Sequence, residues 1–195
     1  MTQPVTFLCL AGSARAASFN QRLAAAAARE AGAQGAVVTL LSPRDYAMPL
    51  YDGDLEAREG APHAAVALAN HFKTAQAVFI ASPEYNASIS PFLKNALDWV
   101  SRVKADGEPP LFAYKNRVFA IGSASPGALG GMRGLIALRH CMELGLGALV
   151  LPDQIAVPNA GQAFDEAGAL TDDRSAAALK RVVGAAIDAA ARFRR

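Results

Sequence analysis

The sequence has few of the features that mark secreted, zinc-binding or nucleic-acid-binding proteins. Its 195 residues include only two cysteines, Cys9 and Cys141, which lie far apart, so neither a disulfide framework nor a zinc site is expected. The net charge is only +2 and no basic run interleaves with aromatic residues, so we expect no nucleic-acid partner. A hydrophobic fraction of 52% excludes a disordered chain.

Several familiar sequence signals are also missing. The first apolar run, residues 5–11, has no basic segment before it and is too short to span a membrane. We interpret it as a buried strand, which places Cys9 in the core, and expect a cytoplasmic protein with no membrane partner. The dinucleotide fingerprint GxGxxG, the Walker A loop and the G-x-S-x-G nucleophile elbow are all absent. The three histidines are scattered along the sequence, so we expect no metal site.

What is present is an alternation of short apolar runs with segments of helical period. The runs, each of strand length, cover residues 5–11, 37–41, 77–82, 118–123 and 148–151. Helices are expected at about 18–32, 63–73, 90–100 and 132–144, and after residue 173. This order predicts one α/β domain, residues 1–195, with a doubly wound five-stranded parallel sheet between two helix layers. Segments 42–62 and 152–170 are expected to be long irregular loops with functional roles.

The segment after the first run, residues 12–20, is typical of an anion site. It opens a helix at the edge where ligands bind in doubly wound sheets, and a helix N-terminus offers free N–H groups to a phosphate. Ser13, Ser18 and Asn20 can add donors, and Arg15 can neutralise charge. The alternative is that Ser18 is only an N-cap and Arg15 only a solvated charge. Four suitable side chains at this position favour phosphate binding.

A second segment, residues 82–91, follows the third run and should emerge beside the first. Its backbone can face the edge of a planar ring, and Tyr85 can supply an aromatic surface; the alternative is an ordinary turn and N-cap. The glycine-rich segment 122–131 follows the fourth run and is either a third ligand loop or a flexible connector. Trp99, on the helix after the second segment, is either a core residue or a subunit contact.

These motifs resemble those of the NADPH-dependent FMN reductase family, which includes bacterial chromate, quinone and azo reductases. The similarity lies in Gly-Ser-x-Arg-x-x-Ser-x-Asn at 12–20, in Pro-Glu-Tyr-Asn at 83–86 with Leu-Lys-Asn-Ala-Leu-Asp-Trp at 93–99, and in segments 48–55 and 130–133. It covers about residues 5–190 and implies a flavodoxin-like fold that binds FMN. The implied contacts are Ser13, Arg15, Ser18 and Asn20 for the phosphate, Pro83, Glu84, Tyr85 and Asn86 for the isoalloxazine, and Ser123, Ala124 and Ser125 for the ribityl chain and ring.

The resemblance predicts an enzyme that passes hydride from NADPH or NADH through FMN to a quinone or similar small acceptor, such as an azo compound, chromate or free flavin. No side-chain acid or nucleophile is required, because the flavin carries the chemistry. Two alternatives are a flavodoxin-type electron carrier and a flavin-free protein that binds phosphoesters. Similar proteins form homodimers or homotetramers, for which segment 42–62 and Arg133 are the candidate contacts.

Overall fold

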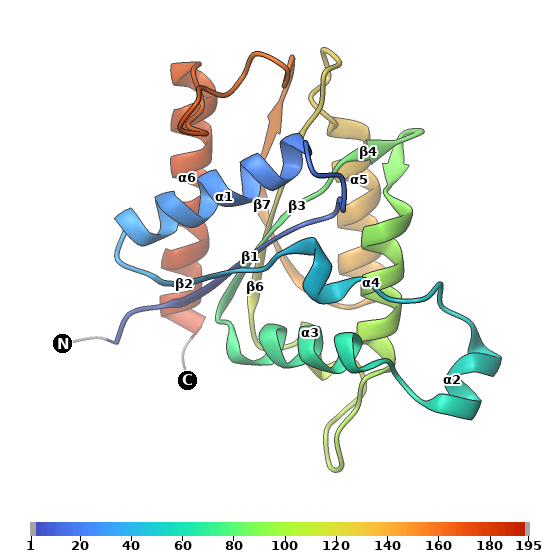
Figure 1. Cartoon of the computed structure of the whole chain (residues 1–195). Helices are drawn as coiled ribbons and strands as arrows, with labels where there is room; N and C mark the ends of the chain where they lie inside the picture. The colour runs from blue at the N-terminus through green and yellow to red at the C-terminus, as the bar shows by residue number, and fades with distance from the viewer. Residues whose placement is uncertain (1–2, 194–195) are drawn as a thin grey trace.

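Five parallel strands form the central sheet of the computed structural model, which describes residues 3–193 (Figure 1). They lie in the order β2-β1-β3-β6-β7. Their bounds are β1 Thr6–Ala11, β2 Val37–Leu40, β3 Ala77–Ala81, β6 Val118–Ala124 and β7 Leu149–Val157. This order confirms the predicted flavodoxin-like doubly wound sheet. The predicted domain, 1–195, extends beyond the described residues at both ends.

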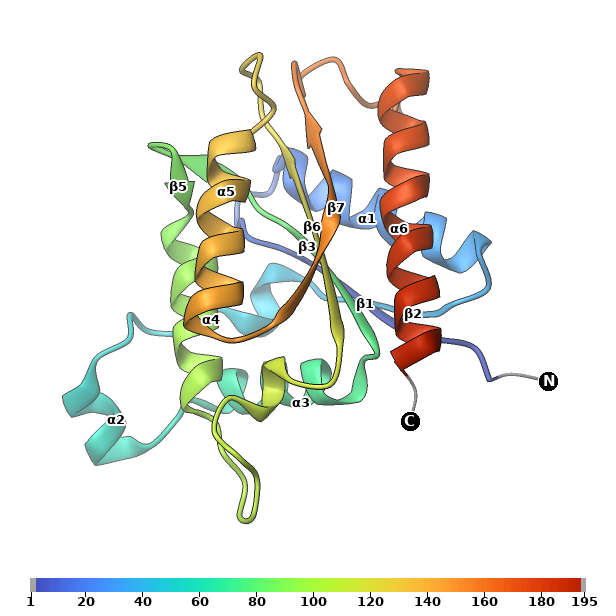
Figure 2. The same ribbon diagram turned by 180° about the vertical axis from the view of Figure 1, so that it is seen from behind.

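Helices cover both faces of this sheet (Figures 1 and 2). One face carries α1 (Phe19–Ala33) and α6 (Asp173–Phe193), and the other carries α3 (His63–Thr74), α4 (Pro91–Arg102) and α5 (Met132–His140). Neighbouring strand residues point to opposite faces, so Phe7 and Cys9 enter the first core while Leu8 and Leu10 enter the second. The central strands β1, β3 and β6 read as continuous apolar runs because both of their faces are buried, whereas the edge strands β2 and β7 are partly exposed. Cys9 has no exposed surface, as predicted.

The segment 42–62 is not the irregular loop that we expected. It contains a 3-10 helix, Pro43–Tyr46, and a short helix α2, Gly53–Glu59, whose N-cap Asp52 accepts hydrogen bonds from the next backbone N–H groups. Helix α2 has no buried residue, so its sequence lacks the apolar stripe by which helices are recognised. Both views show α2 projecting from the body of the molecule (Figures 1 and 2).

Strand β7 continues six residues past the predicted end of the run at residue 151. The apolar run ends at residue 151, and Pro152 lies in a bulge: β6 residues Phe119 and Ile121 pair with Val150 and Gln154 on either side of it. Proline is tolerated there, because β7 is an edge strand and a bulge leaves N–H groups unpaired anyway. The guanidinium of Arg139 donates to the carbonyl of Leu151 at 2.7 Å, which gives this backbone group of the bulge a hydrogen-bond partner. The predicted irregular segment therefore starts only after Val157.

Trp99 is a core residue. It is fully buried on α4, and its indole Nε1 donates to the carbonyl of Pro49 at 2.8 Å. Asn95, one turn earlier, donates to the same carbonyl and accepts from the N–H of Tyr51 at 2.7 Å. These bonds fasten the segment before α2 to α4. The remaining described elements are a π-helical turn that continues α5 (Cys141–Gly145), a 3-10 turn (Phe112–Tyr114) and the two-stranded hairpin of β4 (Glu84–Tyr85) and β5 (Ser88–Ile89).

Candidate functional site

The two predicted ligand segments meet at the carboxyl ends of β1 and β3, where the strand order reverses. Gly12 donates its N–H to the carbonyl of Ala81 at 2.8 Å, and Ser90 donates its hydroxyl to the carbonyl of Gly12 at 2.5 Å. A side chain on Gly12 would have its Cβ 2.9 Å from the Cβ of Leu93, so only glycine allows this approach to α4. The predicted convergence of the two segments is therefore confirmed.

A cleft of about 450 Å³ lies between them. Its lining comes from both segments: Gly12, Ser13, Ala14, Arg15, Tyr85, Ser90, Pro91 and Phe92. Of the predicted site residues, Ser13, Arg15 and Tyr85 line this cleft directly. Its volume falls within the range of small-molecule sites, about 300–1,000 Å³. The cleft thus joins a polar loop with a surface of aromatic side chains.

The loop between β1 and α1 presents donors that have no partner within residues 3–193. The N–H groups of Ser13, Ala14, Ala16 and Ala17 make no hydrogen bond to any of residues 3–193. Arg15 is exposed and forms no ion pair within the same residues. Ser18 caps α1, since its Oγ accepts from the N–H of Gln21 at 3.4 Å. These free donors beside a helix N-terminus suit a phosphate monoester.

Asn20 holds two segments of backbone together instead of facing the cleft. Its side chain is buried, and its amide both donates to the carbonyl of Ala124 and accepts from the N–H of Ala124, each at 2.9 Å. Ala124 is the last residue of β6. Asn20 therefore fixes the end of β6 against the first turn of α1.

The second segment is a tight hairpin. Asn86 and Ala87 at its tip both have positive φ, 51° and 61°, the pattern of a type I′ turn. Tyr85 is 44% exposed beside the cleft, whereas Pro83 is buried against Gly12 and Asn86 is exposed at the tip. The hairpin thus brings one of its four predicted ring contacts, Tyr85, to the cleft wall by its side chain.

Glu84 points away from the cleft to the N-terminus of α5. Its carboxylate accepts from the N–H of Gly134 at 3.1 Å and pairs with Arg133. Burial by itself would raise the pKa of Glu84, but the bonds from Arg133 and Gly134 outweigh it and hold that pKa below its ordinary value. The α5 N-cap is Gly131, which has no side chain, so Glu84 supplies the missing cap from another element. Arg133, a predicted subunit contact, is engaged within its own chain.

The third segment is anchored rather than flexible. Ser125 donates its N–H to the carbonyl of Val157 and accepts from the N–H of Ala160, both at 3.1 Å. Ser123 is fully buried under Gly131, and its Oγ has no hydrogen-bond partner among the described residues. None of Ser123, Ala124 and Ser125 lines the cleft.

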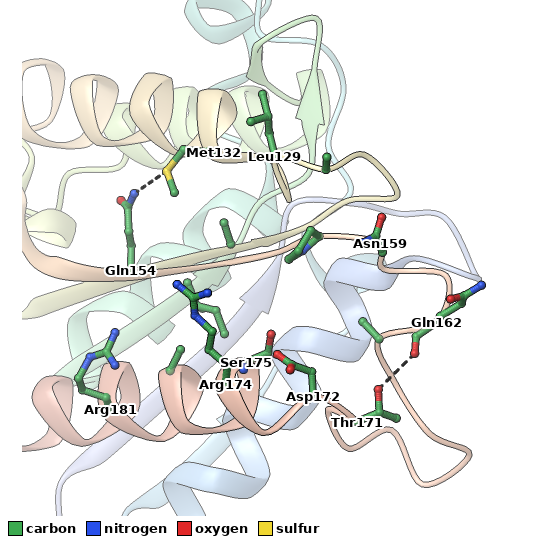
Figure 3. Close-up of a pocket in the computed structure, with 16 residues that line it drawn as sticks. Leu129, Met132, Gln154, Asn159, Gln162, Thr171, Asp172, Arg174, Ser175 and Arg181 are labelled. Carbon is green, nitrogen blue, oxygen red and sulfur yellow. Dashed lines mark hydrogen bonds between the residues drawn. The ribbon is translucent and has the colours of Figure 1, made fainter.

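A larger hollow, of about 780 Å³, lies elsewhere, along the free edge of β7 between α5 and α6 (Figure 3). Its walls include Leu129 and Met132 on one side and Arg174 and Arg181 on the other. No predicted site residue lines this groove. It lies at the sheet edge and not where the strand order reverses, so the topology favours the smaller cleft as the ligand site.

Two residues that the sequence analysis did not select shape the first loop. Gln21 donates its amide to the carbonyls of Ser13 and Arg15 at 3.0 and 2.7 Å. Tyr46 is fully buried, and its hydroxyl donates to the carbonyl of Ala11 at 2.5 Å and accepts from the same residue's N–H. Burial raises the pKa of Tyr46, so it keeps the proton it donates. Gln21 could have been noticed beside the Ser-x-Asn motif, but nothing in the sequence pointed to Tyr46.

The part of the chain from residue 3 to 193 holds neither a candidate metal cluster nor a candidate membrane span. Between residues 3 and 193, no group of three or more histidine, cysteine or acidic side chains is arranged to hold a metal ion. Over the same part of the chain, no helix has the length and apolar character needed to cross a membrane.

The strand order defines a flavodoxin-like α/β protein, and the cleft at its switch point is the candidate ligand site. The family model of the NADPH-dependent FMN reductases matches residues 5–162. A quinone reductase of Escherichia coli (strain K12) is 36% identical over 151 residues, 77% of this chain and 76% of the relative. An NAD(P)H-dependent FMN reductase of Pseudomonas aeruginosa is 33% identical over 177 residues, 90% of this chain and 89% of the relative. The flavoenzyme NAD(P)H:(acceptor) oxidoreductase FerB of Paracoccus denitrificans superposes with a TM-score of 0.80 at 25% identity, covering 97% of this chain and 98% of FerB.

The chain therefore belongs to the NADPH-dependent FMN reductase family. This membership confirms the family predicted from the motifs, makes the protein an oxidoreductase, and confirms FMN and NAD(P)H as its cofactors. It also favours the reductase over the two alternatives, an electron carrier and a flavin-free protein.

Proposed function

We propose that the protein reduces quinones or similar small acceptors with NADPH or NADH, as a single FMN-binding domain. The observation that supports this most is the cleft at the switch point, whose lining combines a loop of unpaired donors with the aromatic side chain of Tyr85. The relatives named above as quinone and FMN reductases support the same substrate class.

The first loop would hold the phosphate of FMN. Arg15 offers a planar guanidinium without a competing acid, and Ser13 offers a hydroxyl next to the free N–H groups. Ser18 keeps the helix N-terminus ordered, and Asn20 acts indirectly by fixing the end of β6. The loop thus neutralises the phosphate with one full charge and several backbone dipoles.

The second and third segments would form the walls around the ring. Tyr85 lies at the cleft and can contact the isoalloxazine by its side chain. Pro83, Glu84, Asn86, Ser123, Ala124 and Ser125 would act through backbone groups or by holding these walls in place, as Glu84 does for α5. When bound, FMN supplies two-electron transfer between the nicotinamide and the acceptor. The chain's own residues would bind and orient it.

A spectrum of the purified protein tests this function. We expect flavin absorbance that is bleached by NADPH or NADH without oxygen and restored by a quinone. An electron carrier would stay oxidised with NADPH, and a protein without retained FMN would show no flavin absorbance; either outcome would contradict the proposal.

The protein is proposed to act as a homodimer or homotetramer in the cytoplasm. Helix α2 supports this assembly: it projects from the body, has no buried residue in the single chain, and follows Leu50, which is 78% exposed. Because Arg133 is bound to Glu84, segment 42–62 is the better candidate for the contact. Sedimentation should give a dimer or tetramer, and deletion of residues 53–59 should yield monomers. A monomer that retains FMN at micromolar concentration would contradict the proposed assembly.

A further inference from the structure

The side chain of Gln21 lies on the first turn of α1, directly below the loop that it holds. Its Nε2 donates both of its hydrogens to loop carbonyls, to Ser13 at 3.0 Å and to Arg15 at 2.7 Å. Its own backbone N–H donates to Ser18, so the residue contacts the loop at three points. No other side chain of residues 3–193 makes as many hydrogen bonds to this loop.

These bonds occupy carbonyl oxygens of the loop and leave its N–H groups free. The carbonyls of Ser13 and Arg15 accept from Gln21, that of Arg15 also accepts from the N–H of Ser18 at 3.1 Å, and the carbonyl of Gly12 is bound to Ser90. Carbonyl oxygens carry partial negative charge and would repel a phosphate, whereas N–H groups attract it. With three carbonyls occupied, the loop keeps its N–H groups free for an anion. An anion site built in advance in this way loses less conformational entropy on binding.

We propose that Gln21 is a positioning residue that holds the loop in the shape needed by the phosphate of FMN. The proposal rests on the phosphate site described above and extends it to a residue that does not itself line the cleft. We expect its effect to be specific to the phosphate, because the carbonyls of Ser13 and Arg15 share planar peptide units with the free N–H groups of Ala14 and Ala16.

The variant Gln21→Met tests this role, because methionine keeps a long unbranched side chain but cannot donate. The matched control is Gln34→Met at the other end of α1, where the amide donates to Glu30 at 2.7 Å and lies far from the loop. We would measure the dissociation constants of FMN and of riboflavin, which lacks the phosphate, together with the melting temperature of the apoprotein. We expect FMN binding to weaken about tenfold in Gln21→Met, from the loss of two neutral hydrogen bonds. Riboflavin binding and the melting temperature should match those of the control.

Two results would overturn the proposal. One is an FMN affinity equal to that of the parent protein. The other is an equal loss of FMN and riboflavin binding with a lower melting temperature than the control, which would mean that Gln21 only stabilises the fold. Arg15→Ala separates this failure from failure of the phosphate site itself. If Arg15→Ala weakens FMN binding and Gln21→Met does not, only the role of Gln21 is wrong; if neither variant weakens it, the phosphate site is wrong as well.

Discussion

The cleft at the switch point and the groove along β7 differ in size and in chemistry. The groove is larger, about 780 against 450 Å³. Of the groove's two arginines, Arg181 lies 3.3 Å from Asp153, while Arg174 forms no ion pair between residues 3 and 193. Asp172 serves as a helix cap by accepting from the N–H of Ser175. The cleft and its adjoining loop have Arg15 without an ion pair and four backbone N–H groups without an acceptor, counted over residues 3–193. Unsatisfied donors therefore indicate a ligand site better than volume does, because a bound anion restores the missing hydrogen bonds.

The largest expected effect is a difference in stability between alanine variants of two glycines, one at the cleft and one near the groove. Gly12→Ala would bring a Cβ to 2.9 Å from Leu93 and 3.1 Å from Pro83, so the loop or α4 must move. We expect a loss of about 1–3 kcal/mol in the free energy of unfolding, measured by urea denaturation, and weaker FMN binding. Gly161→Ala, near the groove, is the control because nothing lies within 4 Å of its added Cβ. Equal stability of the two variants would contradict this packing.

Alanine variants of two arginines test whether the phosphate binds in the cleft or in the groove. Arg15→Ala should weaken FMN binding about tenfold to a hundredfold, because a hydrogen bond to a charged group contributes about 1.5–3 kcal/mol. Arg174→Ala, in the groove, should leave FMN affinity unchanged. Both constants can be measured by the quenching of flavin fluorescence. If Arg174→Ala has the larger effect, the groove and not the cleft binds the phosphate.

The cap of α5 should depend on pH. The pKa of Glu84 is lowered in the folded state, so its contribution to stability is present above the ordinary carboxyl pKa and is lost as pH falls through the lowered value. Glu84→Gln should lower the free energy of unfolding by about 1 kcal/mol at pH 7, since its partner Arg133 is partly exposed. At acidic pH, the free energy of unfolding of Glu84→Gln should equal that of the parent protein. Asp153→Asn, which breaks the exposed pair of the groove, should cost less at neutral pH. A gap for Glu84→Gln that persists at low pH would rule out the carboxylate as the cap.

The smallest expected effect is at the tip of the hairpin. Ala87 has a φ of 61°, which glycine adopts without strain. Ala87→Gly should raise the free energy of unfolding by up to about 1 kcal/mol, reduced by the greater chain entropy of glycine in the unfolded state. Thermal unfolding would measure it. A destabilised variant would mean that the methyl group of Ala87 makes contacts that outweigh the strain.

The fold was readable from the sequence where a physical pattern repeats over several residues. Apolar runs indicated all five strands of the sheet, and for β1, β3 and β6 the reason is burial on both faces. Helix α2 was missed because it buries nothing, and the second half of β7 was missed because the continuous apolar run stops before Pro152 and Asp153. Of the site residues, Ser13, Arg15 and Tyr85 reach the cleft as expected from their motifs.

The sequence by itself determined the two motifs, their position after β1 and β3, and hence the class of cofactor. Tertiary structure decided the direction of each polar side chain. Asn20 and Glu84, both in the motifs, turn to Ala124 and Gly134, while Gln21 and Tyr46, outside the predicted contacts, hold the residues of the first loop and the end of β1. The reason is that motifs record which residue types occur together along the chain. A hydrogen bond depends instead on which backbone groups lie within about 3 Å, and folding brings these together from distant segments.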